Sequence, residues 1–114
     1  MQGLEGDMII TNSKSIRHES KILRHSARGQ ECLVRIPGHC NFDPSTTILA
    51  HLGGGGMGVK KSDLFGSFCC SACHDVLDGR VRSKLSKDEL ELMHRQGVER
   101  TQSYWLDNFM VTFA

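Results

Sequence analysis

Two pairs of cysteines constrain the fold of this chain more than any other feature of the sequence. The first pair, Cys32 and Cys40, is separated by seven residues, and the second pair, Cys70 and Cys73, is separated by two. Thiolates in two such pairs can close one tetrahedral zinc site. A structural zinc contributes roughly 10–16 kcal/mol in small modules, which exceeds the stability of many domains of this size. The spacing therefore predicts a zinc-stabilised domain with these four cysteines as ligands.

Alternatives to this ligand set stay open at the level of sequence. His39 precedes Cys40 and could replace it as a ligand, and the four cysteines could instead be buried free thiols. Cys69 is the fifth cysteine, and because side chains alternate along a strand, we expect it to turn away from the metal and to pack in the core. We expect no signal peptide and a reducing cytosol, where a clustered Cys-x-x-Cys indicates metal binding rather than disulfides.

Apolar and β-branched residues predict three short strands. These cover residues 32–36, 47–51 and 64–69. Residues 41–46 are expected to form a loop. The dense glycines at 53–58 are expected to form a second loop, which is either mobile or allows another backbone to approach closely.

Three helices are predicted from apolar periodicity and from stop and start signals. They cover residues 14–28, 70–78 and 86–109. Gly29 and Gly79 are expected to end the first two, and Ser86 with Glu89 forms a capping box that begins the third. Together the elements predict a single α+β domain over residues 14–114, preceded by a flexible start at residues 1–13.

The net charge of +1 identifies no partner, but the charge is unevenly distributed along the 114 residues. The predicted helix at 14–28 contains five basic residues and one acidic residue. A basic helix suits the phosphate backbone of a nucleic acid, although a solvated helix face has the same composition. No apolar run has membrane-spanning length. We therefore expect a cytoplasmic protein that does not bind membranes.

Two histidines beside the cysteine pairs are candidates for chemistry. His51 ends an apolar strand, and a neutral imidazole near pH 7 can take a proton from an attacking water, so we predict that it is a general base. His74 follows the last cysteine, and Asp78 lies one helical turn later on the same face. This pair could hold Mg²⁺ or Mn²⁺ at a scissile phosphate. The competing interpretation of Asp78 is helix capping or an ion pair with a nearby arginine.

At these positions the chain resembles the small HNH-like nucleases of phages and prophages typified by YbcO. The stretches that carry the resemblance are ARGQECLVRIPGHCN at 27–41, TTILAH at 46–51, CSACHD at 70–75 with Asp78, and GVERTQSYWL at 97–106. The resemblance implies a ββα-metal core on a zinc-bound treble clef, flanked by N-terminal and C-terminal helices. It also implies action on DNA in a bacterial host cell, often near recombination functions.

The chain departs from the broader HNH pattern at two positions. Ala50 stands where many HNH enzymes have a metal ligand, so we expect Asp78, or after it Asp63, to supply the missing ligand. The asparagine that usually orients the base histidine is also absent. The carboxylate of Asp63 could provide that orienting hydrogen bond to His51.

Basic residues around these motifs could form one positive surface for DNA phosphates. The candidates are Arg17, Lys21, Arg24, Arg28, Lys60, Lys61, Arg80 and Arg82. Contacts of this kind position a strand without reading its sequence.

Three functions follow from these patterns. The first is a metal-dependent DNA endonuclease that hydrolyses phosphodiester bonds in phage recombination or DNA processing. The second is a non-catalytic zinc module that binds DNA and assists phage recombination proteins. The third is a zinc-stabilised protein-interaction domain that docks through its long helix. Retained DNA binding without cleavage would favour the second, and no DNA affinity at low salt would favour the third.

Overall fold

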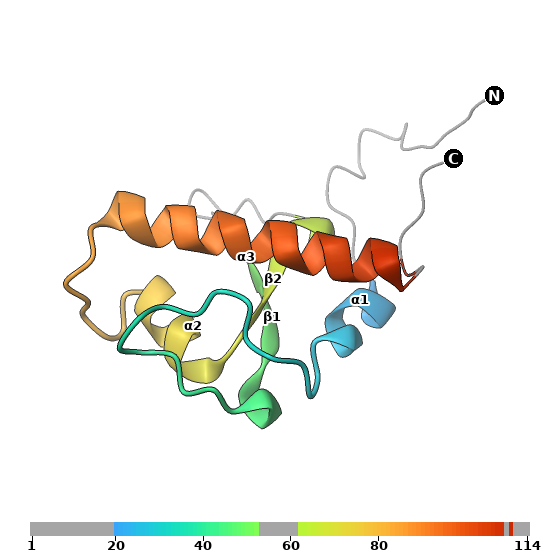
Figure 1. The fold of residues 1–114 in the computed structure, drawn as a ribbon, viewed down its shortest axis with the longest axis horizontal. Helices are drawn as coiled ribbons and strands as arrows, with labels where there is room; N and C mark the ends of the chain where they lie inside the picture. The colour runs from blue at the N-terminus through green and yellow to red at the C-terminus, as the bar shows by residue number, and fades with distance from the viewer. Residues whose placement is uncertain (1–19, 53–61, 109, 111–114) are drawn as a thin grey trace.

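The computed structural model describes residues 20–52, 62–108 and 110, so the predicted flexible start and the glycine loop at 53–58 lie outside the described residues. The elements in chain order are α1 (Lys21–Ser26), the 3₁₀ turn η2 (Pro44–Thr46), β1 (Ile48–His51), the 3₁₀ turn η3 (Asp63–Phe65), β2 (Gly66–Cys69), α2 (Ser71–Leu77) and α3 (Lys87–Asp107). Figure 1 shows α3 along one side of the two strands, with α1 and α2 toward opposite ends of α3. The small α+β class is as predicted. Among the described residues, no helix combines the length and apolar character that a membrane span requires.

The two strands form an antiparallel pair at the centre of the domain. Ile48 lies opposite Cys69, and His51 lies opposite Gly66. The predicted strand at 47–51 is observed, whereas the first residues of the predicted strand at 64–69 belong to η3. Gly66 has a packing reason to lack a side chain, because a Cβ there would lie 2.6 Å from the Leu49 side chain.

The strand predicted at residues 32–36 is wrong. The described backbone bends at residues 33–34, and Arg35 has a φ of 55°, which is far from extended geometry. Leu33 N still donates to the carbonyl oxygen of Phe68 in β2 at 2.8 Å, but the backbone N–H groups of the last two residues bond to sulfur and not to a strand. Arg35 N donates to Cys32 Sγ, and Ile36 N donates to Cys73 Sγ, each at 3.4 Å.

Local signals explain the helix boundaries. Ser20 begins α1 with its Oγ accepting from Leu23 N at 3.2 Å, and the predicted residues 14–19 of this helix lie outside the described residues. Gly79, with a φ of 81°, follows the end of α2 as predicted. The capping box of Ser86 and Glu89 is present at the start of α3, within the predicted range 86–109.

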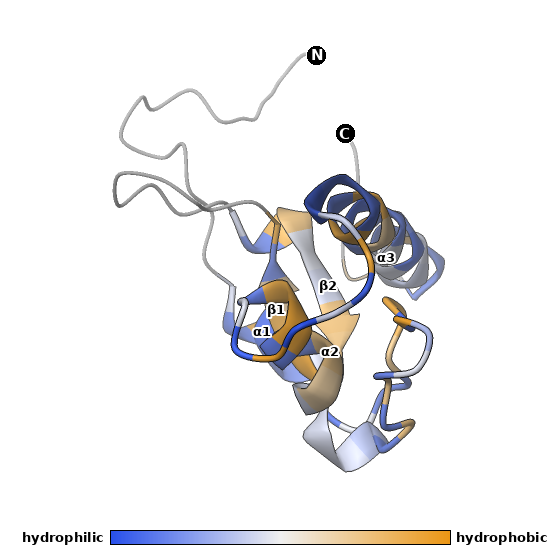
Figure 2. Cartoon of the chain, turned by 90° about the vertical axis from the view of Figure 1, so that its left-hand side faces the viewer, coloured by the Kyte–Doolittle hydropathy of each residue, from blue (hydrophilic) through white to orange (hydrophobic). Residues whose placement is uncertain are grey.

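Two apolar clusters lie on the hairpin, and together they bury the whole of β2. One cluster contains the cysteines and the inner face of α2. The other centres on Phe68 and Trp105, whose rings meet edge to face with centroids 6.1 Å apart. Figure 2 shows orange, apolar residues on both strands, whereas most of α3 is blue or white. The helix therefore contributes a narrow buried stripe, and its other faces are mostly polar, with Leu92 and Leu106 as exposed apolar residues.

Candidate functional site

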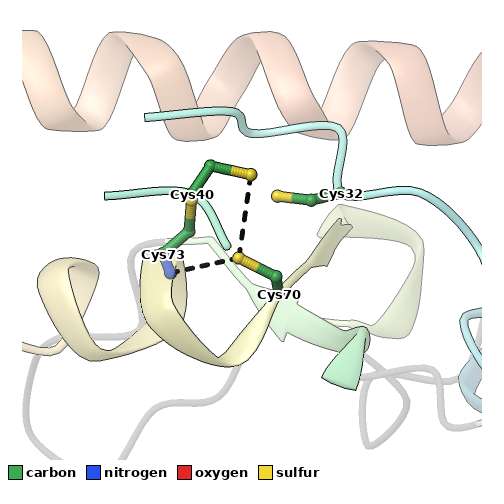
Figure 3. Close-up of side chains that lie close together, drawn as sticks. All are labelled: Cys32, Cys40, Cys70 and Cys73. Atoms are coloured by element: carbon green, nitrogen blue, oxygen red, sulfur yellow. Dashed lines mark hydrogen bonds between the residues drawn. The ribbon is translucent and has the colours of Figure 1, made fainter. Parts of the chain in front are cut away.

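The four cysteines predicted as metal ligands come together. Their Sγ atoms all lie within 4.8 Å of one another, and they form the one group of this kind among the described residues. Cys40 Sγ and Cys70 Sγ are 3.9 Å apart. Figure 3 shows that Cys32 and Cys40 come from the loop before β1, whereas Cys70 and Cys73 come from the start of α2. His39 is not part of the group, so the geometry favours Cys40 over its neighbour.

Backbone amides point at these sulfur atoms. Cys73 N donates to Cys70 Sγ at 3.3 Å, in addition to the amide bonds that reach Cys32 and Cys73. The backbone of Phe42 hydrogen-bonds to Cys40, and Phe42 has a positive φ of 55°, which is uncommon for a bulky residue. Hydrogen bonds of this kind favour the charged form of an acceptor. The loop conformation therefore suits four thiolates.

The pKa values of the thiols show how closely the sulfurs interact. Hydrogen bonds from the Cys69 and Cys73 thiols hold the pKa of Cys32 well below its usual range. The pKa of Cys73 is raised mainly by its hydrogen bond with Cys32 and, as the second cause, by burial. Burial raises the pKa of Cys40 to about 11. Four negative charges so close together would repel one another. A cation that replaces the remaining protons would hold all four as thiolates, and the cluster can therefore hold a metal ion.

Cys69 is fully buried, as expected for a core thiol, and it is not part of the four-sulfur group. Its Sγ lies 3.5 Å from the carbonyl oxygen of Cys70, and its thiol also hydrogen-bonds to Cys32. Strand alternation therefore does not turn it fully away from the cluster, because the strand ends at Cys69 and the ligands follow in a helix.

His51 and Asp63 meet at the end of the hairpin. His51 Nε2 and Asp63 Oδ1 are 2.6 Å apart, and their side chains are 36% and 3% exposed. Burial raises the pKa of the Asp63 carboxyl, but hydrogen bonds from His51 and Ser20 and the charges of His51 and Arg24 outweigh it, so this pKa lies below its usual range. An ionised carboxylate only accepts hydrogen bonds, so His51 must donate from Nε2–H. When the ring is neutral, this arrangement leaves the Nδ1 lone pair available to accept a proton.

His74 and Asp78 also lie side by side, at one end of α2. His74 Nε2 is 3.3 Å from Asp78 Oδ2. The competing ion pair is present as well, because Arg80 Nη1 lies 3.2 Å from the same carboxylate oxygen and 3.1 Å from Asp75 Oδ1. No third His, Cys, Asp or Glu among the described residues joins the pair to form a compact ligand group. A cation at this position would have two protein ligands and would displace Arg80.

Comparison with known proteins places this arrangement in a family. A family model described as "Putative nuclease YbcO" matches residues 21–108. The chain belongs to the YbcO family. "Putative nuclease YbcO" of Escherichia coli K12 is 45% identical to it over 87 residues, which cover 74% of this chain and 90% of the relative. "Putative nuclease ybcO" of Enterobacteria phage 82 matches with the same identity and the same coverage.

A solved structure has the same fold as this YbcO-family chain. It is described as a putative bacteriophage protein from Escherichia coli K-12 MG1655, and it superposes with a TM-score of 0.66 at 39% identity. The match covers 77% of this chain and 100% of the other. The family thus includes phage proteins, and the chain contains nearly the full length of its relatives.

Some of the basic residues predicted to contact DNA in this YbcO-family chain form ion pairs within the protein. Arg24 Nη1 lies 3.2 Å from Asp63 Oδ2, and Arg80 pairs with Asp75 and Asp78. Lys21, Arg28 and Arg82 form no ion pair with the part of the chain that the structure describes. The remaining candidates, Arg17, Lys60 and Lys61, lie outside the described residues.

His94 is a residue of this region that sequence reasoning missed. It is buried in α3, and its Nε2 lies 3.1 Å from the carbonyl oxygen of Ala50, the residue before His51. Burial lowers the pKa of His94, although the hydrogen bond to Ala50 opposes this shift. Because a carbonyl oxygen can only accept, Nε2–H of His94 is the donor in this contact. A hollow of about 290 Å³ opens beside it between α2 and α3. The available signal was helical spacing, because residue 94 shares the inner face of α3 with Leu90 and Val98.

The RTQ stretch, Arg100–Gln102, to which the sequence assigned no role, joins three segments to α3. Arg100 Nη1 donates to the carbonyl oxygen of Leu33, and Gln102 Nε2 donates to that of Leu64, each at 2.7 Å. Between them, Thr101 Oγ1 accepts from Phe68 N at 2.9 Å. These side chains therefore hold three segments against one helix: β2, η3 and the loop at residues 32–40, which we call the cysteine loop.

Proposed function

We propose that this protein is a metal-dependent DNA endonuclease that hydrolyses phosphodiester bonds during phage recombination or DNA processing. Its core would be a zinc-bound treble clef of the ββα-metal, HNH-like type. The observation that carries the proposal is the 2.6 Å contact between His51 Nε2 and the buried Asp63 carboxylate. A histidine held in this way is prepared to act as a base, and the family to which the chain belongs is described as nucleases.

The proposed reaction begins at the free nitrogen of His51. Nδ1 takes a proton from a water as the water oxygen forms a bond to the scissile phosphorus and the bond from phosphorus to the leaving oxygen breaks. The leaving oxygen takes a proton from solvent. Asp63 keeps the proton on Nε2 and stabilises the imidazolium that forms. Mg²⁺ or Mn²⁺, held by His74 and Asp78, would supply positive charge at the phosphate.

The role of the cysteine cluster in this proposal is structural. Four sulfur donors in one compact group suit zinc, and a closed four-thiolate site leaves no open coordination position for chemistry. Because Cys70 and Cys73 belong to the start of α2, a zinc ion here would fix the helix that carries His74 and Asp78. DNA phosphates would contact basic residues in α1 and just after it, including Lys21 and Arg28.

A second candidate function is a non-catalytic zinc module that binds DNA and assists phage recombination proteins. Two observations favour it over an enzyme. Ala50 occupies a position where a metal ligand is expected, and Asp78 is shared with Arg80. Under this alternative, His51 and Asp63 would only stabilise the fold.

A cleavage assay distinguishes the two functions. Zinc-loaded wild type, His51→Ala and the control His25→Ala would be incubated with Mg²⁺ or Mn²⁺ and with linear duplex, single-stranded, flapped and four-way-junction DNA. His25 is an exposed histidine on α1, so its loss controls for a general effect of removing an imidazole. We expect the wild type and His25→Ala to cleave at least one substrate, and we expect His51→Ala to lose roughly 100-fold or more of the rate.

Two outcomes would contradict the enzyme. Equal DNA binding by all three proteins without cleavage would support the binding module. Equal cleavage by the wild type and His51→Ala would mean that another group activates the water.

A further inference from the structure

The N-terminal helix contributes two donors to the carboxylate that holds His51. Asp63 Oδ2 accepts a hydrogen bond from Ser20 N at 2.5 Å and another from Arg24 Nη1 at 3.2 Å. The other oxygen, Oδ1, is the atom that contacts His51. The two oxygens thus divide their partners: one faces α1, and the other faces the end of β1.

This division gives α1 control over the geometry of His51. The carboxylate is planar, so fixing Oδ2 with two donors also fixes the direction in which Oδ1 points. The Asp63 side chain is 3% exposed, and water therefore has little access to replace a lost donor. A buried charge that loses a partner is strongly disfavoured, and the structure around it has to respond.

We propose that Arg24 is a positioning residue of the active site, which acts on His51 through Asp63 and is assisted by the backbone N–H of Ser20. The inference rests on the proposed function in one respect, since it assigns a catalytic consequence to the contact. The contact links segments that are 39 residues apart in the sequence. Through it, α1 becomes part of the catalytic apparatus.

The competing role for Arg24 is a DNA phosphate contact, which the basic character of the helix suggests. The Arg24 side chain is 41% exposed, so some of its donors do reach solvent. The two roles differ in what they predict. A phosphate contact affects DNA affinity and its salt dependence, whereas a positioning residue affects turnover at saturating DNA.

Steady-state cleavage by Arg24→Met and Arg24→Lys separates these roles. We expect Arg24→Met to lower kcat roughly tenfold to a hundredfold, as is typical for loss of a supporting hydrogen bond, with the DNA affinity changed by less than about twofold. Arg24→Lys keeps the charge and one donor, so it should recover most of kcat. Arg28→Met is the comparison for a phosphate contact, and it should weaken binding and reduce the salt slope by about one. Arg95→Met, on the outer face of α3, should change neither quantity.

A second measurement does not depend on cleavage. The ¹⁵N chemical shifts of the His51 ring report which nitrogen carries the proton in DNA-free protein. We expect the wild type and Arg95→Met to show the Nε2–H tautomer, and we expect Arg24→Met to show a mixture. In the Asp63→Asn background, Arg24→Met should have little further effect on the tautomer, because both substitutions would act on the same contact.

The outcomes separate this inference from the proposed function. If the wild type cleaves no DNA, the proposed function fails, and the tautomer measurement decides the inference alone. An unchanged His51 tautomer in folded Arg24→Met would overturn the inference. An unchanged kcat combined with weaker, less salt-dependent DNA binding would also overturn it and would assign Arg24 to the phosphate backbone.

Discussion

Asp63 holds a charge in a part of the molecule that is almost closed to water. It is tolerated there because three donors, from His51, Ser20 and Arg24, surround its two oxygens. Such a carboxylate stabilises the fold only while it is ionised. Its contribution to the free energy of unfolding therefore depends on pH, and the direction of its pKa shift decides the pH range.

Asp63→Asn should lower the free energy of unfolding at pH 7 by about 1–3 kcal/mol, because the amide replaces one acceptor with a donor and removes the charge. The folded-state pKa lies below the unfolded value of about 3.9. The contribution is therefore complete above that value and is lost as the pH falls through the folded pKa. Urea unfolding at pH 7, 6 and 5 should show a constant difference between wild type and variant.

The exposed Asp107→Asn, in the last turn of α3, is the control for this series. It should change the free energy of unfolding by less than about 0.5 kcal/mol. Acid also protonates the cysteine cluster, so the informative quantity is the difference between proteins. A difference that narrows already between pH 7 and pH 5 would show that the Asp63 pKa is raised, against our expectation.

Among the secondary-structure elements, α2 depends on its surroundings for its stability. It is seven residues long, and isolated helices shorter than about 12–15 residues are marginal in water. Its N-cap is Cys70, whose Sγ accepts from Cys73 N. The same sulfur belongs to the four-thiol group, so a bound metal would fix both the cap and the direction of the helix.

Cys70→Ala and Cys69→Ala make a matched pair of adjacent, fully buried cysteines. We expect Cys70→Ala to lose the bound zinc and with it most of the roughly 10–16 kcal/mol that such a site contributes, so the domain should lose its tertiary structure. Cys69→Ala should keep one zinc per chain and cost about 0.5–3 kcal/mol. Zinc content by elemental analysis and near-UV circular dichroism would check both. Equal zinc content in the two variants would contradict the proposed ligand set.

For the whole molecule, α3 is the element that joins the others. Its RTQ stretch reaches the cysteine loop, β2 and η3, and Trp105 Nε1 donates to Ser26 Oγ of α1 at 2.8 Å. The helix approaches the backbone at residues 33–34 closely at Gly97, a residue without a side chain. A Cβ at Gly97 would lie 2.8 Å from Val34 Cγ2 and 3.3 Å from the Leu33 carbonyl oxygen.

Gly97→Ala tests this close approach because we expect it to lower the free energy of unfolding, whereas the same substitution in an exposed helix usually raises it. At an exposed helix position, alanine is about 1 kcal/mol more favourable than glycine. Here the added methyl group would push α3 away from the cysteine loop, and we expect a loss of about 1–3 kcal/mol in the free energy of unfolding. Gln96→Ala, at an adjacent exposed position, is the control and should be nearly neutral. A stabilised Gly97→Ala variant in urea unfolding would contradict the packing argument.

Much of the secondary structure followed from local signals in the sequence. Three such signals are the capping box of Ser86 and Glu89, the helix stop at Gly79 and the apolar run before His51. Each depends only on residues within about one helical turn or along one strand, so the observed elements lie close to their predicted ranges. The prediction failed at residues 32–36 for the opposite reason. Their β-like composition was overridden by amide bonds to sulfur, including one to Cys73, 37 residues away.

By itself, the sequence determined which residues are the candidates for the chemistry: four cysteines at metal-ligand spacing, His51, and the pair of His74 and Asp78. Whether a residue can act as a ligand or a base depends on the functional group of its side chain, and the sequence gives that group directly. Tertiary structure alone decided how they are supported. The donors from Ser20 and Arg24 reach Asp63 across 43 and 39 residues, and His94 reaches Ala50 across 44. Such contacts form only when α1 and α3 fold onto the hairpin, because burial there makes each polar group require a partner.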